Sequence, residues 1–421
     1  MDKIKLIDVC DVIVPMRDKP KIFVNEDEWI PRCRIEDIDW KFLNTSKSNR
    51  FVSKKTIDEM HLRIFPKWTV ICAVTWASIW TYAITTRPLI TNQTFAWLVC
   101  KDGLYNEFLY YYIKLLTSAF INKSVWCAQA YITRETLENL EIPNISIDNQ
   151  IKIAKILKDI DDKIELNNKI NKELESMSRE LYEYRFVQFD FPCSHNNNCA
   201  GYKSCWGKMV WNEELKREIP EWWEVKKIKN ITKHINTWLN PRQNFRLNDG
   251  WNIKYITVKN LTKWWTIDFS WCDFITQDSK DMINARSKIN IWDILFASIA
   301  PLWRCYLIYD EPKEREINES VFSIRVNKEV SSEYLYMYFM SKQFIKSAEN
   351  SSTWSVFNWI RIWTLEDMNI LVPNKWVLDL FSKKIKSIFM IKRNNEKQNN
   401  KLSELRDFLL PMLMNGQVTM K

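Results

Sequence analysis

The chain has 421 residues, 46% of them hydrophobic and 27% charged, and its formal net charge is +9. This is the composition of a globular protein, which excludes an intrinsically disordered chain and is sufficient for two or three domains. The positive excess suits a protein that binds nucleic acid but does not require one. Charges fall in every turn of residues 1–11, unlike a secretory leader, so we expect a cytoplasmic protein without a membrane partner.

Residues 68–86 contain no charged side chain and are long enough to span a bilayer as a helix. The segment is nevertheless rich in Thr, Ser and β-branched residues, which favour strands. We therefore predict two buried strands joined by a turn, and no membrane-spanning helix.

Ten cysteines are scattered along the chain and none forms a CxxC pair, which argues against a zinc ribbon or a thioredoxin motif. Cys193, His195, Cys199 and Cys205 lie together in a polar stretch, and these side chains are potential zinc ligands. Their spacing fits no standard zinc site. We therefore favour a solvated linker and expect no metal, although the spacing leaves a zinc site open.

The balance of tryptophan and glycine is unusual, with 22 Trp and 5 Gly. Glycine ordinarily makes up about 7% of a chain, and here Trp stands where turns require glycine. Examples are Trp76, Trp80, Trp264–Trp265 and Trp292. Turns and bulges often need a positive φ, which glycine adopts freely and a bulky residue does not.

We hypothesise that most of these tryptophans are glycine in the native organism, because some bacterial lineages read the codon UGA as glycine. The alternative is a protein that is truly rich in tryptophan. Within Ile219–Trp223 the recoded sequence is Ile-Pro-Glu-Gly-Trp, so Trp223 is predicted to be a genuine tryptophan.

The chain contains one long internal repeat. The segment that starts at Glu107 returns at Glu333, and Trp68 is matched by Trp292. Matched segments lie between 224 and 230 residues apart. A period of this length indicates a duplicated domain and not a solenoid.

Each copy ends in a helix with the alternating spacing of a coiled-coil seam. The predicted seam positions of the first helix are Ile153, Leu157, Ile160, Ile164, Asn167, Asn171, Leu174 and Leu181. Those of the second are Phe381, Ile385, Ile388, Asn395, Asn399, Leu402 and Leu409. We predict that the two helices pair antiparallel, with the asparagines specifying register; the alternative is that each helix docks on its own domain.

The length of these helices bears on their function. About 32 residues at 1.5 Å each give roughly 48 Å, which exceeds one turn of B-DNA at about 34 Å. Such a rod would set a fixed spacing between two half-sites.

The globular parts are predicted to be mixed α/β (α+β), because short strand-like runs alternate with polar turns and a helix follows each set. The strand-like runs are Val70–Val74, Tyr255–Val258 and Ile294–Ala297, and the helices are Asn106–Leu116 and Ser332–Ser341. The predicted domains are a first recognition domain over 1–147, a first coiled-coil helix over 148–190, a linker loop over 191–217, a second recognition domain over 218–375 and a second helix over 376–415.

Three segments carry a family resemblance: residues 238–275, 291–308 and 409–418. Together with the duplication and the two heptads, they resemble the specificity subunits of Type I restriction-modification systems. Reading Trp as Gly strengthens each match. The resemblance covers essentially the whole chain, and the order of the segments is more specific than any one of them.

The resemblance implies a non-catalytic subunit with two target recognition domains, each reading one half of a bipartite site in double-stranded DNA. It implies that the antiparallel coiled coil measures the unread spacer and holds two methyltransferase subunits. Two motor-nuclease subunits join in those systems that restrict. The methyl donor S-adenosylmethionine would bind the partner, so no cofactor is expected on this chain.

The resemblance does not map the DNA contacts, so we chose candidates by chemistry. Base edges are read by Arg, Lys, Asn, Gln and carboxylates, and phosphates by basic and hydroxyl side chains. The candidates in the first head are Arg34, Glu36, Asp37, Thr75, Ser78, Gln129 and Tyr131. Those in the second are Arg242, Thr257, Lys259, Asn260, Ser298, Arg304, Asn358 and Arg361. Opposite charges at Glu36 and Lys259 suggest that the heads read different sequences.

Two other classes of function were weighed. An independent enzyme is disfavoured because neither GxxxxGK nor GxGxxG occurs, even with glycine in place of Trp, and no Asn-Pro-Pro-aromatic motif is present. A coiled-coil adaptor that binds only protein explains the helices but assigns no role to the two heads.

Overall fold

A computed structural model describes residues 2–14, 29–74, 81–123, 133–192, 201–237, 246–248, 253–262, 266–269, 272–285, 288–299, 304–351 and 359–417. The chain divides into two compact units. Unit 1 contains Met1–Asn168 together with Lys397–Lys421, and unit 2 contains Lys169–Glu396. Each unit thus combines one globular head with one end of each long helix.

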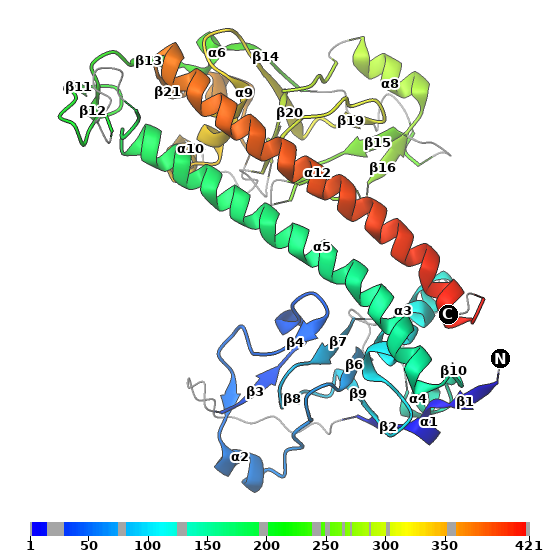
Figure 1. The fold of residues 1–421 in the computed structure, drawn as a ribbon. Helices are drawn as coiled ribbons and strands as arrows, with labels where there is room; N and C mark the ends of the chain where they lie inside the picture. The colour runs from blue at the N-terminus through cyan, green and yellow to red at the C-terminus, as the bar shows by residue number, and fades with distance from the viewer. Residues whose placement is uncertain are drawn as a thin grey trace. The chain divides into compact units, whose positions relative to one another are not determined.

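The first head is a mixed α/β domain, shown in blue and cyan in Figure 1. Its elements are β1 (Lys3–Lys5), α1 (Leu6–Val9), β2 (Cys10–Ile13), β3 (Ile30–Cys33), β4 (Phe42–Leu43), β5 (Phe51–Val52), α2 (Lys54–Glu59), β6 (Val70–Ala73), β7 (Tyr82–Thr85), β8 (Ile90–Thr91), β9 (Phe95–Cys100), α3 (Asn106–Lys123), α4 (Arg134–Glu138) and β10 (Glu141–Pro143). The strands form a five-stranded sheet in the order β2-β9-β6-β7-β4, a three-stranded sheet β5-β3-β8 and the pair β1-β10.

The two strands predicted within residues 68–86 are confirmed. β6 and β7 pair antiparallel, with Val70 opposite Ile84 and Cys72 opposite Tyr82. All four residues of β6 are buried, because one sheet face meets α3 and the other faces a second apolar cluster around Phe65. Within the described part of the chain, no helix is both long and apolar enough to cross a membrane.

The second head repeats this architecture. Its elements are β11 (Met209–Asn212), β12 (Arg217–Pro220), β13 (Glu224–Lys227), α6 (Ile228–Ile231), β14 (Thr232–Asn236), β15 (Ile253–Ile256), β16 (Asp273–Ile275), α8 (Gln277–Asn284), β17 (Ile294–Ala297), β18 (Cys305–Leu307), β19 (Arg315–Ile317), β20 (Val321–Val326), α9 (Ser332–Phe339), α10 (Lys342–Ser351), α11 (Ile362–Glu366) and β21 (Asn369–Val372). They form a four-stranded sheet β14-β20-β17-β18, a three-stranded sheet β16-β15-β19, and the pairs β11-β12 and β13-β21.

The three-stranded sheets show the duplication most directly. In the first head β3 pairs antiparallel with β5 and parallel with β8. In the second head β15 pairs antiparallel with β16 and parallel with β19. This mixed pattern recurs strand for strand, so the structure confirms the duplicated α/β heads.

The expected linker loop over 191–217 is partly wrong. Its second half contains β11 and the start of β12, which pair antiparallel as a hairpin. Before the hairpin, the ring of Tyr202 stacks on that of Phe191, with 4.7 Å between their centroids. Phe191 in turn stacks on Trp223. The polar composition of the segment concealed these few aromatic residues, whose burial orders it.

The two long helices are uninterrupted over most of their length. Helix α5 (Ile147–Tyr182) has 36 residues and continues into a π-helical turn, Glu183–Val187. Helix α12 (Lys375–Met414) has 40 residues and contains Pro411 in its last turn. Each begins one residue before its predicted start. At 1.5 Å per residue their lengths are about 54 and 60 Å.

The helices pair antiparallel within each unit, as predicted. In unit 1 the Asn167 amide donates to Asn399 Oδ1 at 2.8 Å. In unit 2 the Asn395 amide donates to Asn171 Oδ1 at 2.9 Å, and Lys392 Nζ lies 2.7 Å from a Glu175 carboxylate oxygen. Higher numbers on α5 therefore meet lower numbers on α12. All fifteen predicted seam side chains are buried or half-buried.

Each helix also ends in the core of the other head's unit. Leu410, Leu413 and Met414 of α12 are buried with the first head's core in unit 1. Tyr182, the last residue of α5, and Phe186 in the π-helical turn after it are buried with the second head's core in unit 2. Burial of such side chains contributes roughly 1.5–3 kcal/mol each. Neither core is complete without residues that lie in the other half of the sequence.

The backbone supports the glycine hypothesis at several tryptophans. Trp68 and Trp292, which the duplication makes equivalent, have φ of 66° and 72°. Trp206 has φ of 62° and is 95% exposed. Left-handed backbone strains a bulky side chain and suits glycine. Trp223 is buried whereas Trp222 is exposed, in keeping with Trp223 as the genuine residue. Trp76, Trp80 and Trp264–Trp265 lie outside the described residues.

Candidate nucleic-acid interface

The polar loop that follows β15 in the second head is shaped by Asn260. Its Oδ1 accepts hydrogen bonds from the backbone N and the hydroxyl of Thr257, at 2.8 and 3.0 Å. Its Nδ2 donates to the carbonyl of Asp268 at 3.0 Å. Asn260 is 2% exposed, so its amide holds the loop, while the neighbouring Lys259 is exposed.

Two further candidate segments of the second head contact one another beside this loop. Arg304 donates to the carbonyl of Leu261 at 2.9 Å, which ties the segment before β18 to the loop after β15. Ser298 is buried and donates to the carbonyl of Ser320, while its own carbonyl accepts from the backbone N of Ile360. Hydrogen bonds therefore connect the segments that carry Lys259, Ser298, Arg304 and Arg361.

Arg361 is exposed at the edge of this group. Its guanidinium lies 4.5 Å from the ring centroid of Trp359 and 4.6 Å from that of Trp363. Both tryptophans belong to the set for which we hypothesise glycine. In that case the guanidinium loses these two ring contacts and keeps its exposed position.

The equivalent loop of the first head is held by Asp37. Its carboxylate accepts from the backbone N of Arg34 at 2.7 Å and from the backbone N of Lys47 at 2.8 Å. Arg50 Nη2 lies 3.3 Å from the same carboxylate, and Asp37 is 2% exposed. Asp37 and Asn260 therefore stabilise their loops in the same way, because each accepts a hydrogen bond from the backbone N three residues before it.

Glu36 stands next to this buried carboxylate and is exposed, with 58% of its side-chain surface accessible. Its Oε1 lies 3.1 Å from Arg50 Nη2 and 3.7 Å from Arg34 Nη1. Slight burial raises the pKa of Glu36, but a backbone hydrogen bond and the Arg50 guanidinium outweigh it and hold that pKa below its usual value. The side chain is therefore a carboxylate at neutral pH, oriented by a guanidinium.

Several sequence candidates fall outside the described residues: Thr75, Ser78, Gln129, Tyr131, Arg242 and Asn358. The same is true of Cys193, His195 and Cys199. Cys205 is disulfide-bonded, and a sulfur in a disulfide is not a thiolate ligand for zinc. No cluster of three metal-binding side chains occurs in the described ranges.

Arg50 was not among the sequence candidates, although it contacts both Glu36 and Asp37. It immediately precedes β5, the antiparallel neighbour of β3. A basic residue at the start of a strand is a common feature of surfaces. Only the pairing of β5 with β3 brings this one to the loop, and spacing along the chain does not reveal that pairing.

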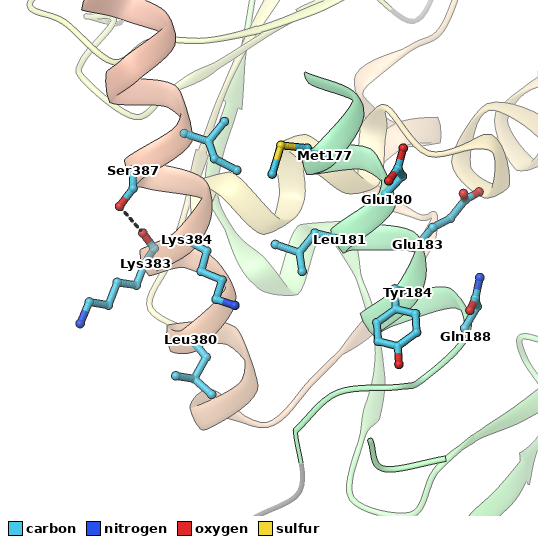
Figure 2. A pocket seen from close by; sticks show the side chains of 11 residues that line it. Met177, Glu180, Leu181, Glu183, Tyr184, Gln188, Leu380, Lys383, Lys384 and Ser387 are labelled. Carbon is cyan, nitrogen blue, oxygen red and sulfur yellow. Dashed lines mark hydrogen bonds between the residues drawn. The ribbon is translucent and has the colours of Figure 1, made fainter. Parts of the chain in front are cut away.

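A second surface lies in unit 2, in a groove of about 990 Å³ between the end of α5 and the start of α12 (Figure 2). Apolar side chains of Met177, Leu181, Leu380 and Ile388 line it, and Lys383, Lys384 and Glu180 border it. Met177 is 56% exposed. Its equivalent in unit 1 is Leu405, which is 45% exposed. Each unit therefore presents exposed apolar surface at the equivalent place on its helices.

Comparison with known proteins agrees with this arrangement. Residues 1–176 match the family model described as the Type I restriction modification DNA specificity domain. The MjaIX specificity subunit of Methanocaldococcus jannaschii is 28% identical over 410 residues, covering 92% of this chain and 87% of the relative. The HindI specificity subunit of Haemophilus influenzae is 25% identical over 341 residues, covering 68% and 71%.

The fold has also been observed experimentally. The crystal structure of a Type I restriction-modification S subunit from M. genitalium aligns over 100% of this chain and 96% of its own, with a TM-score of 0.56 and 15% identity. Both share the architecture of duplicated heads on antiparallel helices. The chain is similar to Type I restriction-modification specificity subunits, by the family model over residues 1–176 and by relatives aligned over most of its length.

Proposed function

We propose that this chain reads a bipartite site in double-stranded DNA, with each head recognising one half-site. The observation that carries the proposal is the repeated loop after β3 and β15. A buried residue, Asp37 or Asn260, holds each loop from beneath. Each loop also presents an exposed charged side chain immediately before that buried residue, Glu36 or Lys259. Two loops with the same backbone support and different exposed side chains suit one protein that reads two different half-sites.

The helix pair is proposed to set the length of the unread spacer and to bind two methyltransferase subunits. The exposed apolar side chains Met177 and Leu405 support this, because the duplication makes their positions equivalent. Equivalent surfaces suit two copies of one partner. Motor-nuclease subunits would join in a restricting complex. S-adenosylmethionine would bind the methyltransferase, so the chain itself requires no cofactor.

The test is methylation mapping by long-read sequencing in cells that express this chain with its methyltransferase subunit. We expect a new methylated motif of two short half-sites around a gap of constant length. The motif should disappear when this chain is omitted. A verified soluble complex that methylates no bipartite motif would overturn the proposal and favour a protein-binding adaptor.

A direct binding measurement separates the two functions further. DNA that carries the mapped motif should be bound more tightly as salt is lowered, because counterions are released from phosphates. The preference for the motif over a scrambled duplex should persist at physiological salt. An adaptor without base reading would show the salt dependence of its basic surface at most, with equal affinity for both duplexes.

A further inference from the structure

We propose that Glu36 and Lys259 each determine the base accepted at one position of their half-sites. Glu36 would select cytosine by accepting a hydrogen bond from its N4 amino group. Lys259 would select guanine by donating to O6 or N7. The inference rests on the proposed function and deepens it, because it assigns base chemistry to one residue in each head.

The two residues occupy the same place in the duplicated loop. The backbone N of Arg34 donates to Asp37 at 2.7 Å, and the backbone N of Thr257 donates to Asn260 at 2.8 Å. Glu36 and Lys259 each immediately precede the residue that accepts this bond. Because the buried acceptor shapes the loop, the exposed residue beside it can change without a change of backbone. The duplication has reversed the charge at this position while it kept the frame.

Two neighbouring guanidiniums allow the Glu36 carboxylate to approach a base. A carboxylate at a DNA surface is repelled by phosphates unless cations stand beside it. Arg50 and Arg34 supply two guanidiniums, both facing Oε1. The carboxylate is 58% exposed and offers about four lone-pair sites, so it keeps capacity to accept from an amino group. Among the bases a carboxylate pairs best with cytosine N4 in the major groove.

Lys259 has the opposite chemistry. Its ammonium carries three donors and no acceptor, which matches the O6 and N7 acceptors of guanine. In the described part of the chain no carboxylate forms an ion pair with it. The neighbouring Arg304 is held by the carbonyl of Leu261 at 2.9 Å, so a second cation flanks the same loop. Lys259 is thus a free donor at an exposed tip.

The experiment compares methylation motifs of the wild-type complex with those of Glu36→Gln and Lys259→Ala. A glutamine amide both donates and accepts and so pairs with adenine. Glu36→Gln should therefore relax one cytosine of the first half-site toward adenine and leave the second half-site unchanged. Lys259→Ala should relax one guanine of the second half-site and leave the first unchanged. We expect discrimination at the affected position to fall roughly tenfold to a hundredfold.

Each variant is the matched control for the other, since the head that is not mutated must keep its half-site. Thermal unfolding of both variants should stay close to wild type, because the changed side chains are exposed. Full methylation with both motifs unaltered would overturn the inference. The inference would also be overturned if both variants altered the same half-site. Failure of the proposed function is distinguishable, because the wild-type complex would then give no bipartite motif at all.

Discussion

The two heads are copies of one fold in which the buried residues that shape the loops are alike and the exposed residues beside them differ. Both contain the mixed three-stranded sheet, and both hold the following loop with a buried acceptor, Asp37 or Asn260. Both also anchor a buried glutamate of the helix after the sheet to a lysine on a long helix. Glu107 pairs with Lys158 at 2.7 Å, and Glu333 pairs with Lys386 at 3.5 Å. Both heads have thus kept these buried contacts, whereas the side chains that the two loops expose differ.

The heads also differ at a buried position of the three-stranded sheet. In the first head Ile90 of β8 lies opposite Arg32 of β3. At the equivalent place in the second head Glu316 of β19 lies opposite Tyr255 of β15. Ile90 and Glu316 are both buried. The second head therefore buries a carboxyl group where the first buries an alkyl side chain.

The largest effect is expected from disrupting the contact between the end of α12 and the first head's core. Leu413→Ala removes a side chain that is 2% exposed in the core of unit 1. The transfer term and the resulting cavity should lower the free energy of unfolding of that unit by about 2–5 kcal/mol. Hydrogen exchange should therefore show faster opening in the first head and little change in the second.

This result would be surprising from sequence alone, because residue 413 follows the second head along the chain. Phe408→Ala is the matched control, since Phe408 lies on the same helix but is 63% exposed. It should leave exchange in both heads near wild type. Faster opening of the second head in Leu413→Ala would contradict the assignment of α12's end to unit 1.

A smaller effect concerns the buried glutamate. Burial raises the pKa of Glu316 to about 8. Between the usual glutamate value and this pKa the folded state binds more protons than the unfolded state, so stability falls as pH rises through the window. Glu316→Gln should remove this slope in the second head, as measured by urea unfolding between pH 5 and about pH 9.

The exposed neighbour Glu314 offers the control, because Glu314→Gln changes the same charge without burial. Its unfolding should keep the wild-type slope. An unaltered slope in Glu316→Gln would show that other groups carry the pH dependence of this head.

The smallest effect on stability is expected at tryptophans whose backbone has a positive φ. Trp206→Gly and Trp68→Gly should each raise the free energy of unfolding by ~1 kcal/mol, because glycine relieves a positive φ. Trp97→Gly is the control, and it should instead lower that free energy, as a large-to-small substitution in a core does. Its ring is fully buried against Phe65, and its indole N–H donates to Thr91 at 2.9 Å. Peptide masses from the native organism should give glycine at 68, 206 and 292 and tryptophan at 97 and 223.

The sequence predicts those features that follow a periodic pattern or that occur in both copies of the repeat. The heptads predicted both long helices, and the repeat predicted two heads with one topology. The reading loops were located by the same repeat, which aligned Arg34, Glu36 and Asp37 with Thr257, Lys259 and Asn260. Exposure within those loops was not predictable, since Asp37 and Asn260 are buried where only tertiary contacts can bury them.

Contacts between distant segments were equally hidden. Nothing in the heptad of α12 indicates that its last turn enters the first head's core, because an apolar stripe does not specify the surface that covers it. The hairpin of β11 and β12 escaped prediction since its strands are short and polar. Arg50 escaped because strand pairing, and not spacing, places it beside Glu36.

The division of the chain into units has a consequence for its synthesis. Unit 2 is one continuous stretch, Lys169–Glu396, whereas unit 1 is built from both ends of the polypeptide. As the ribosome releases the chain, the first head emerges before the second but lacks Leu410, Leu413 and Met414 until α12 has been synthesised. The second head can complete its core before those residues appear. The head that is made earlier is therefore the one that completes its core later, and part of its apolar surface stays exposed until the last turn of α12 has formed.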